Sequence, residues 1–79
     1  MLDSRQQALV FLMEESNRLA SICAHNVNAL HRTKTKAALE SQIGVIFAAL
    51  KEIQEEFSLD EMRVEKNALD AYDKRLPKR

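Results

Sequence analysis

The stretch LESQIGVIFAALKEIQEEF, residues 39–57, decides the fold. Its apolar side chains recur at alternating steps of four and three residues, which is the spacing of one face of a helix. These positions are Leu39, Ile43, Ile46, Leu50, Ile53 and Phe57. Further apolar residues at 45 and 47–49 widen this face. A helix that is hydrophobic nearly all round is buried on several sides, so we expect it to have more than one packing partner.

Working outward, the chain is expected to be all-α, with three helices over about residues 4–31, 36–57 and 59–76. The first two helices are expected to form a hairpin, joined by a polar loop over His31–Lys36 in which Thr33 or Thr35 caps the second helix. Asp3 or Ser4 offers the cap of the first helix. The seam expected along it follows the same period: Leu9, Leu12, Ser16, Leu19, Cys23, Asn26 and Leu30.

The third helix is predicted to begin at a capping box, Ser58–Glu61, in which serine and glutamate satisfy each other's free backbone donors. Pro77 is expected to stop it, because proline cannot continue a helix. The residues expected to face inward are Leu59, Met62, Leu69, Tyr72 and Leu76.

Composition narrows the class of protein. Seventy-nine residues make one domain, close to the lower size limit for an independent core. Twelve basic and twelve acidic residues cancel, so no global field draws the chain to nucleic acid or a membrane, and neither is expected as a partner. The single Cys23 cannot form a disulfide within the chain and suits a reducing cytoplasm. We expect a cytoplasmic protein without a membrane-spanning segment.

The small core also predicts self-association. A first helix of about 40 Å is too long to be covered by one partner in so short a chain. Pairing two helical hairpins into a four-helix bundle is a common remedy for a small core. We therefore expect a homodimer, with a monomeric three-helix bundle as the alternative.

Two acidic motifs carry the chemistry. Glu14-Glu15-Ser16-Asn17-Arg18 lies on the first helix, and Leu39-Glu40-Ser41-Gln42-Ile43-Gly44-Val45 lies on the second. Together they resemble the EExxE and ExxD elements of the MazG-like, all-α nucleoside triphosphate pyrophosphohydrolases. The resemblance runs from about Gln6 to Lys78. In that family, carboxylates on adjacent helices hold Mg²⁺, which polarises the phosphates and activates water.

Most of the ligand positions that the resemblance implies are not carboxylates here. Glu14 and Glu15 match glutamates of the family motif, but the remaining positions hold Arg18, Gln42 and Val45. We expect Arg18 to form an ion pair with these glutamates, in the space that a metal ion would occupy. No metal is expected, except Mg²⁺ at Glu15 if the site is rearranged. The site therefore resembles the relic of a catalytic centre.

Two functions remain open at this point. The first is a non-catalytic binding or regulatory protein on the pyrophosphohydrolase scaffold, which acts by protein contact or nucleotide binding. By analogy, it is the kind of small protein that bacteriophages or mobile elements carry. The second is an active Mg²⁺-dependent pyrophosphohydrolase with a rearranged carboxylate site, which Glu65 and Asp70 would help to form.

Other residues have simpler interpretations. Basic side chains form two clusters that would serve as an anion-binding rim or remain solvated: Arg32, Lys34 and Lys36, with Lys74 and Arg75. The amides of Asn26 and Gln42 are expected to fix the register of the helices. Cys23 is expected to be a buried, inert thiol on the seam.

Overall fold

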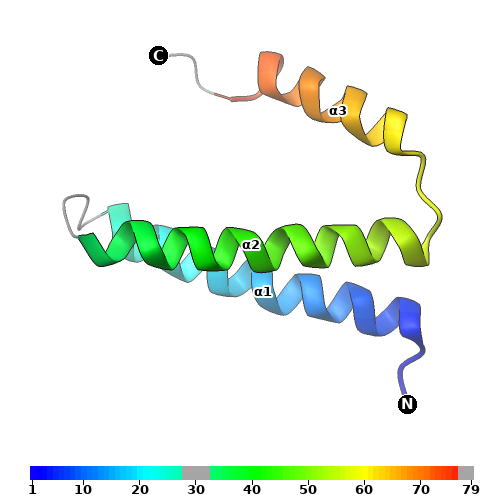
Figure 1. Cartoon of the computed structure of the whole chain (residues 1–79), viewed down its shortest axis with the longest axis horizontal. Helices are drawn as coiled ribbons and strands as arrows, with labels where there is room; N and C mark the ends of the chain where they lie inside the picture. Colours follow the sequence, from blue (N-terminus) through cyan, green and yellow to red (C-terminus); the bar gives the residue numbers. More distant parts are fainter. Residues whose placement is uncertain (28–32, 77–79) are drawn as a thin grey trace.

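A computed structural model, which describes residues 1–27 and 33–76 with the side chains of 33–35 left aside, contains three helices and no strand in those residues. They are α1 (Ser4–Val27), α2 (Thr33–Glu56) and α3 (Glu61–Lys74). The predicted all-α class and the hairpin of the first two helices are confirmed: α1 and α2 run antiparallel and side by side, while α3 crosses back on the side of α2 (Figure 1). None of the described helices is long and apolar enough to cross a membrane.

The helix boundaries differ from the prediction at several ends. The described part of α2 begins at Thr33, so the expected loop over His31–Lys36 is helical from Thr33 onward. The predicted cap at Thr33 or Thr35 lies outside the described side chains. Lysine and alanine are good helix formers, which explains why Lys34–Ala38 extends the helix. α3 spans Glu61–Lys74 and is shorter at both ends than predicted. The predicted end of the first helix, residues 28–31, lies outside the described residues.

The start of α1 is held by a reciprocal pair of hydrogen bonds. The Gln6 backbone N–H donates to Asp3 Oδ1 at 2.8 Å, and the Asp3 N–H donates to Gln6 Oε1 at 2.9 Å. Two of the four free donors at the helix start are thereby satisfied. Asp3 is thus the cap, one of the two residues predicted.

The turn between α2 and α3 is built differently from the prediction. Ser58 has φ 50° in the left-handed region, its N–H donates to the Glu55 carbonyl, and the Leu59 N–H donates to the Gln54 carbonyl. This pattern is a Schellman motif, which ends α2. The cap of α3 is Asp60, whose Oδ1 accepts from the N–H groups of Met62 and Arg63 at 2.9 and 3.4 Å. The predicted Ser58–Glu61 capping box is therefore wrong, because Ser58 already closes the preceding helix.

About half of the residues predicted to form the interface between α1 and α2 lie there in the structure. On α1, Leu12, Leu19 and Asn26 lie at the interface as expected, but Ala8, Glu15 and Ile22 take the places expected for Leu9, Ser16 and Cys23. On α2, Leu39, Ile46 and Ile53 lie inside as expected, whereas Gln42, Ala49 and Glu56 replace Ile43, Leu50 and Phe57. In both helices the alternate positions are shifted by one residue. The interface therefore lies to one side of each helix's apolar arc, not at its centre.

Small side chains let the two helices approach. Ala8 and Ala49 are the fully buried apolar residues among those described, and no large side chain is fully buried. The open end of the hairpin is tied by Ser4 Oγ, which donates to Glu56 Oε2 at 2.9 Å, and by the Arg5 guanidinium, 5.6 Å from the centre of the Phe57 ring. The hairpin is thus held by contacts along its length rather than by a bulky core.

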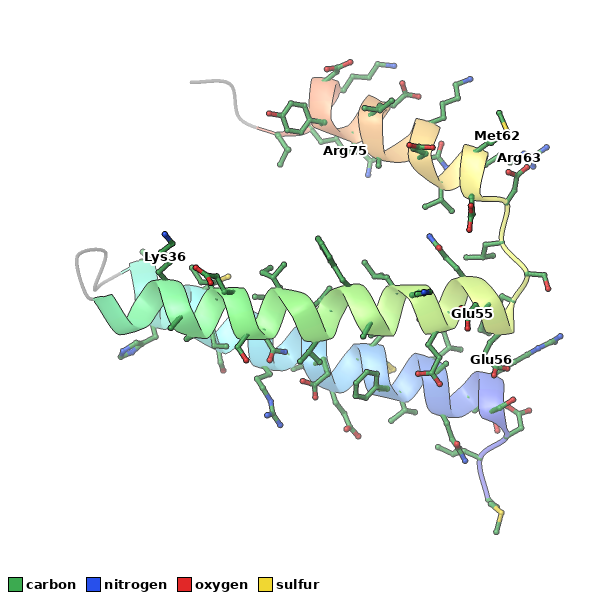
Figure 2. The ribbon with its side chains drawn as sticks, in the orientation of Figure 1. Lys36, Glu55, Glu56, Met62, Arg63 and Arg75 are labelled. Atoms are coloured by element: carbon green, nitrogen blue, oxygen red, sulfur yellow. The ribbon has the colours of Figure 1, made fainter. Side chains whose placement is uncertain are left out.

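α3 has at most a marginal contact with the hairpin. None of its described residues is buried, and Met62 and Arg63 point away from α2 at its start (Figure 2). The prediction that Leu59, Met62, Leu69, Tyr72 and Leu76 face inward is wrong, because all five are exposed. The molecule measures 40 × 34 × 15 Å.

Candidate functional site

The structure brings two of the five predicted site residues together across the hairpin. Glu15 and Gln42 are both buried, at 9% and 6% exposure. Gln42 Nε2 donates to the main-chain carbonyl of Glu15 at 2.9 Å and to its Oε1 at 3.1 Å. The amide therefore binds the carboxylate that the resemblance assigns to a metal. Both of its contacts lock the position of α2 relative to α1.

Arg18 is a weaker partner of the same carboxylate. Its Nε lies 3.8 Å from Glu15 Oε1, so the expected ion pair is present, but the Arg18 side chain is 68% exposed. An ion pair with one arm in water contributes little to stability. Gln42, rather than Arg18, is the residue that occupies the inner side of Glu15.

The other predicted positions do not complete a metal site. Glu14 is exposed and Val45 is partly buried without any oxygen to offer. Within residues 1–27 and 33–76, no three His, Cys, Asp or Glu side chains come together to hold a metal ion. Mg²⁺ requires several oxygen ligands, and here one carboxylate faces an amide N–H donor. The residues present do not fit the metal that the resemblance implies.

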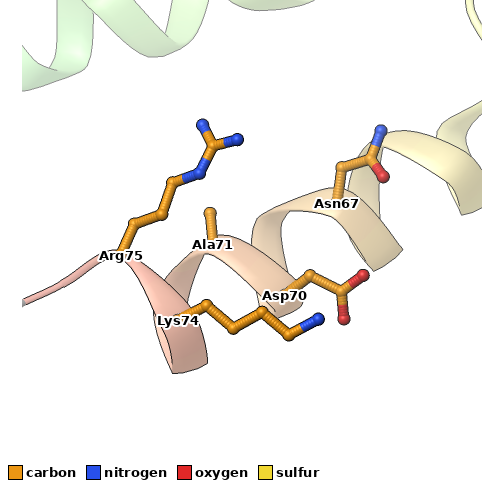
Figure 3. A pocket seen from close by; sticks show the side chains of 5 residues that line it. All are labelled: Asn67, Asp70, Ala71, Lys74 and Arg75. Carbon is orange, nitrogen blue, oxygen red and sulfur yellow. The ribbon is translucent and has the colours of Figure 1, made fainter.

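The carboxylates expected to help in a rearranged site lie on α3. Glu65 and Asp70 are both exposed on a helix that has at most a marginal contact with the hairpin. Asp70 instead lines a hollow on α3 together with Asn67, Ala71, Lys74 and Arg75 (Figure 3).

The basic candidates are only partly described. Lys74, Arg75 and Asp70 all line the hollow on α3, where Lys74 extends toward the side of Asp70 and Arg75 points away from both (Figure 3). Lys36 is exposed near the start of α2. Arg32 and the side chain of Lys34 lie outside the described residues. Because an acidic group shares the hollow, its charge is mixed, which does not favour an anion over a cation.

A larger feature that the sequence reasoning missed is an exposed apolar face on one side of the hairpin. It consists of the residues that directly follow the interface positions in each helix. On α1 these are Leu9, Met13, Ser16, Ala20, Cys23 and Val27, and on α2 they are Glu40, Ile43, Phe47, Leu50, Gln54 and Phe57, with Ser16, Glu40 and Gln54 as the polar members. Each residue is turned about 100° from the interface. Since the two helices are antiparallel, the same step turns both sets to the same side of the hairpin.

This apolar face contains some of the most exposed large side chains in the protein, including Met13 at 64% and Phe47 at 67%. Phe47 and Leu50 also line a hollow that continues to Leu59. The predicted burial of Cys23 is wrong: the thiol is exposed on this face. The opposite side of the hairpin carries Glu14 and Arg18 together with Phe11 and Ala48. Glu14 and Arg18 therefore lie on a different side of the hairpin from the apolar face.

Asn26 is the third buried polar residue of the hairpin. It is 8% exposed, and its Nδ2 has no hydrogen-bond partner in the part of the chain that the structure describes. With Glu15 and Gln42 it places polar groups inside the interface, as predicted for the two amides.

Comparison of the chain with protein-family models, curated proteins and solved structures finds no match.

Proposed function

We propose that this chain is a non-catalytic helical binding protein, built on a scaffold like that of the MazG-like pyrophosphohydrolases. The observation that carries the proposal is the pair of hydrogen bonds from Gln42 to Glu15. They engage the best-placed carboxylate of the two acidic motifs with a neutral donor. A buried carboxylate already paired in this way is a poor ligand for a divalent cation.

The binding activity is assigned to protein contact rather than to a nucleotide. Among the described residues, Arg18 is the cation that lies against Glu15, whereas large apolar side chains are exposed on both the hairpin and α3. Large exposed apolar patches are typical of protein interaction sites. Regulation of a protein target is the role we favour, of the kind that a phage or mobile element carries, by contact through apolar side chains that the homodimer leaves exposed.

The same reasoning extends to assembly and location. We propose that the chain forms a homodimer with a four-helix-bundle core, since its hairpin buries so few apolar side chains by itself. Its single cysteine suits a reducing compartment, and we propose the cytoplasm.

The test of the non-catalytic role is direct. The protein is incubated with a panel of nucleoside triphosphates and Mg²⁺ or Mn²⁺, and released pyrophosphate is measured. We expect none above the rate without protein, and no heat of metal binding in calorimetry. Turnover that disappears in Glu15→Ala but persists in Glu52→Ala, an exposed glutamate away from the relic site, would refute the proposal.

A further inference from the structure

The amount of exposed surface indicates that the protein is incomplete as a single copy. The chain exposes 7077 Å². A compact monomer of 9.0 kDa exposes about 4,900 Å². The excess, about 2,200 Å² per chain, is shared between the hairpin and the uncovered α3, and it is large enough to include a permanent interface that buries about 1,000 Å² or more of each partner.

We propose that the apolar face of the hairpin packs against the same face of a second copy, with the loop ends of both hairpins at the same end of the bundle. This inference rests on the homodimer proposed above, and it assigns the surface and the arrangement.

The arrangement follows from the uneven distribution of side chains along the face. Glu15 lies opposite Gln42 in the hairpin, so counting along the antiparallel helices places Phe47 level with the space between Leu9 and Met13. The large apolar side chains therefore gather in the half near the open end. Toward the loop, most of the corresponding positions carry small or charged residues, with Val27 as the exception: Ser16, Ala20, Cys23, Lys36 and Glu40.

Two face-to-face arrangements have two-fold symmetry. With the loops at the same end, α1 of one copy faces α2 of the other at the same level, and Phe47 meets Leu9 and Met13 of the second copy. With the loops at opposite ends and the helices fully overlapped, α2 faces α2, and Phe47 lies level with the stretch between Glu40 and Ile43 of the second copy. The first arrangement places apolar side chains on apolar side chains. Every helix has antiparallel neighbours in both arrangements, so the helix dipoles do not distinguish them.

A charge-pairing experiment tests both the surface and the arrangement. Met13→Glu and Phe47→Lys each place an unpaired charge in the proposed interface, and we expect each to raise the dimer dissociation constant about 100-fold or more. Both residues are largely exposed in the single hairpin, so neither change removes a contact that holds it together. Ser21→Glu and Ala48→Lys, on the opposite side of the hairpin, serve as matched controls and are expected to leave the constant within about threefold.

The two variants are then mixed in equal amounts and examined by sedimentation equilibrium and native mass spectrometry. In the same-end arrangement, the glutamate at position 13 of one copy faces the lysine at position 47 of the other, and the second Met13–Phe47 contact is unchanged. We therefore expect heterodimers to form over the same concentration range as the wild-type dimer. In the opposite-end arrangement each charge meets its uncharged counterpart, and mixing restores nothing.

Each outcome decides the proposal. Heterodimers that form on mixing support it, also when the separate variants are unfolded and gain helix only together. The proposal is overturned if the wild-type chain stays monomeric at all concentrations, as expected if α3 of the same chain or a foreign protein covers the face. It is also overturned if both variants dimerise like the wild type, or if mixing restores no dimer. None of these outcomes depends on pyrophosphate release, so the non-catalytic role fails or stands separately.

Discussion

Gln42 donates from a single amide nitrogen to both the main chain and the side chain of Glu15. The two residues are 27 positions apart and belong to different helices, so this contact fixes how α1 and α2 are aligned. It also takes the oxygen that a metal would need. One side chain therefore has a structural role and a chemical consequence.

Removing that amide is expected to destabilise the hairpin. Gln42→Leu leaves the buried Glu15 carboxylate without its donor, and we expect a loss of about 2 kcal/mol in the free energy of unfolding. Urea denaturation of the single variants and of Gln42→Leu with Glu15→Leu measures the coupling. The double variant is expected to recover most of the loss, because neither polar group then remains unpaired. A double variant as unstable as the sum of the single ones would contradict the contact.

Adding carboxylates is expected to create metal binding. The combined variant Arg18→Glu, Gln42→Glu and Val45→Asp places oxygen ligands at the three positions that the resemblance assigns to metal ligands. We expect measurable Mn²⁺ binding in calorimetry, and a higher melting temperature with Mn²⁺ than without it. The same substitutions made at exposed positions of α3 serve as a control for non-specific binding.

Small residues, rather than large ones, set the spacing of the hairpin. Ala49 is fully buried against α1, whereas its neighbour Ala48 is exposed. Ala49→Leu is expected to cost about 1–3 kcal/mol through overpacking, and Ala48→Leu to change stability by less than about 0.5 kcal/mol. Thermal or urea unfolding compares the two. Equal effects would show that the interface does not lie where the structure places it.

The left-handed turn at Ser58 predicts a stabilising change. A side chain at φ 50° is strained, and glycine removes the strain, so Ser58→Gly is expected to gain up to about 1 kcal/mol. Ser58→Val is expected to lose at least as much, since a β-branched residue is poorly accommodated there. Ser41→Gly, in the exposed middle of α2, is the control and should be destabilising by about 0.5 kcal/mol.

Gly44 provides an independent check on which side of α2 is free. A methyl group added there meets nothing within 4 Å, and the residue is turned away from both α1 and the apolar face. Gly44→Ala is expected to raise the free energy of unfolding by about 1 kcal/mol through helix propensity alone. A loss of stability, seen in urea denaturation, would indicate that another surface covers this side.

The sequence predicts the helices well and the contacts between them less well. Periodicity finds all three helices and the hairpin, and the cap at Asp3. Periodicity places the interface at the centre of the apolar face of each helix, and it therefore predicts Leu9 and Ile43 at positions where Ala8 and Gln42 make the contact. An apolar face wider than one partner helix does not determine which of its residues contact that helix. The signal that was missed is the second stripe itself, which repeats one residue after the first in both helices.

The third helix shows a different limit. Leu69 and Tyr72 have the spacing of a buried face, yet no other part of the described chain covers them. Spacing reports that a face is apolar, not which surface meets it. The pairing of Glu15 with Gln42 was equally out of reach, because it depends on the alignment of two helices and not on either one.

Along its shortest axis the backbone spans 15 Å, about the depth of a single pair of packed helices. If association supplies the missing depth, the folded fraction rises with the concentration of the chain. Scarce chains would then spend more time open to proteases than abundant ones. The expression level would then set both the number of molecules and the lifetime of each one. A modest change in the rate of synthesis would therefore produce a larger change in the steady-state amount of the protein.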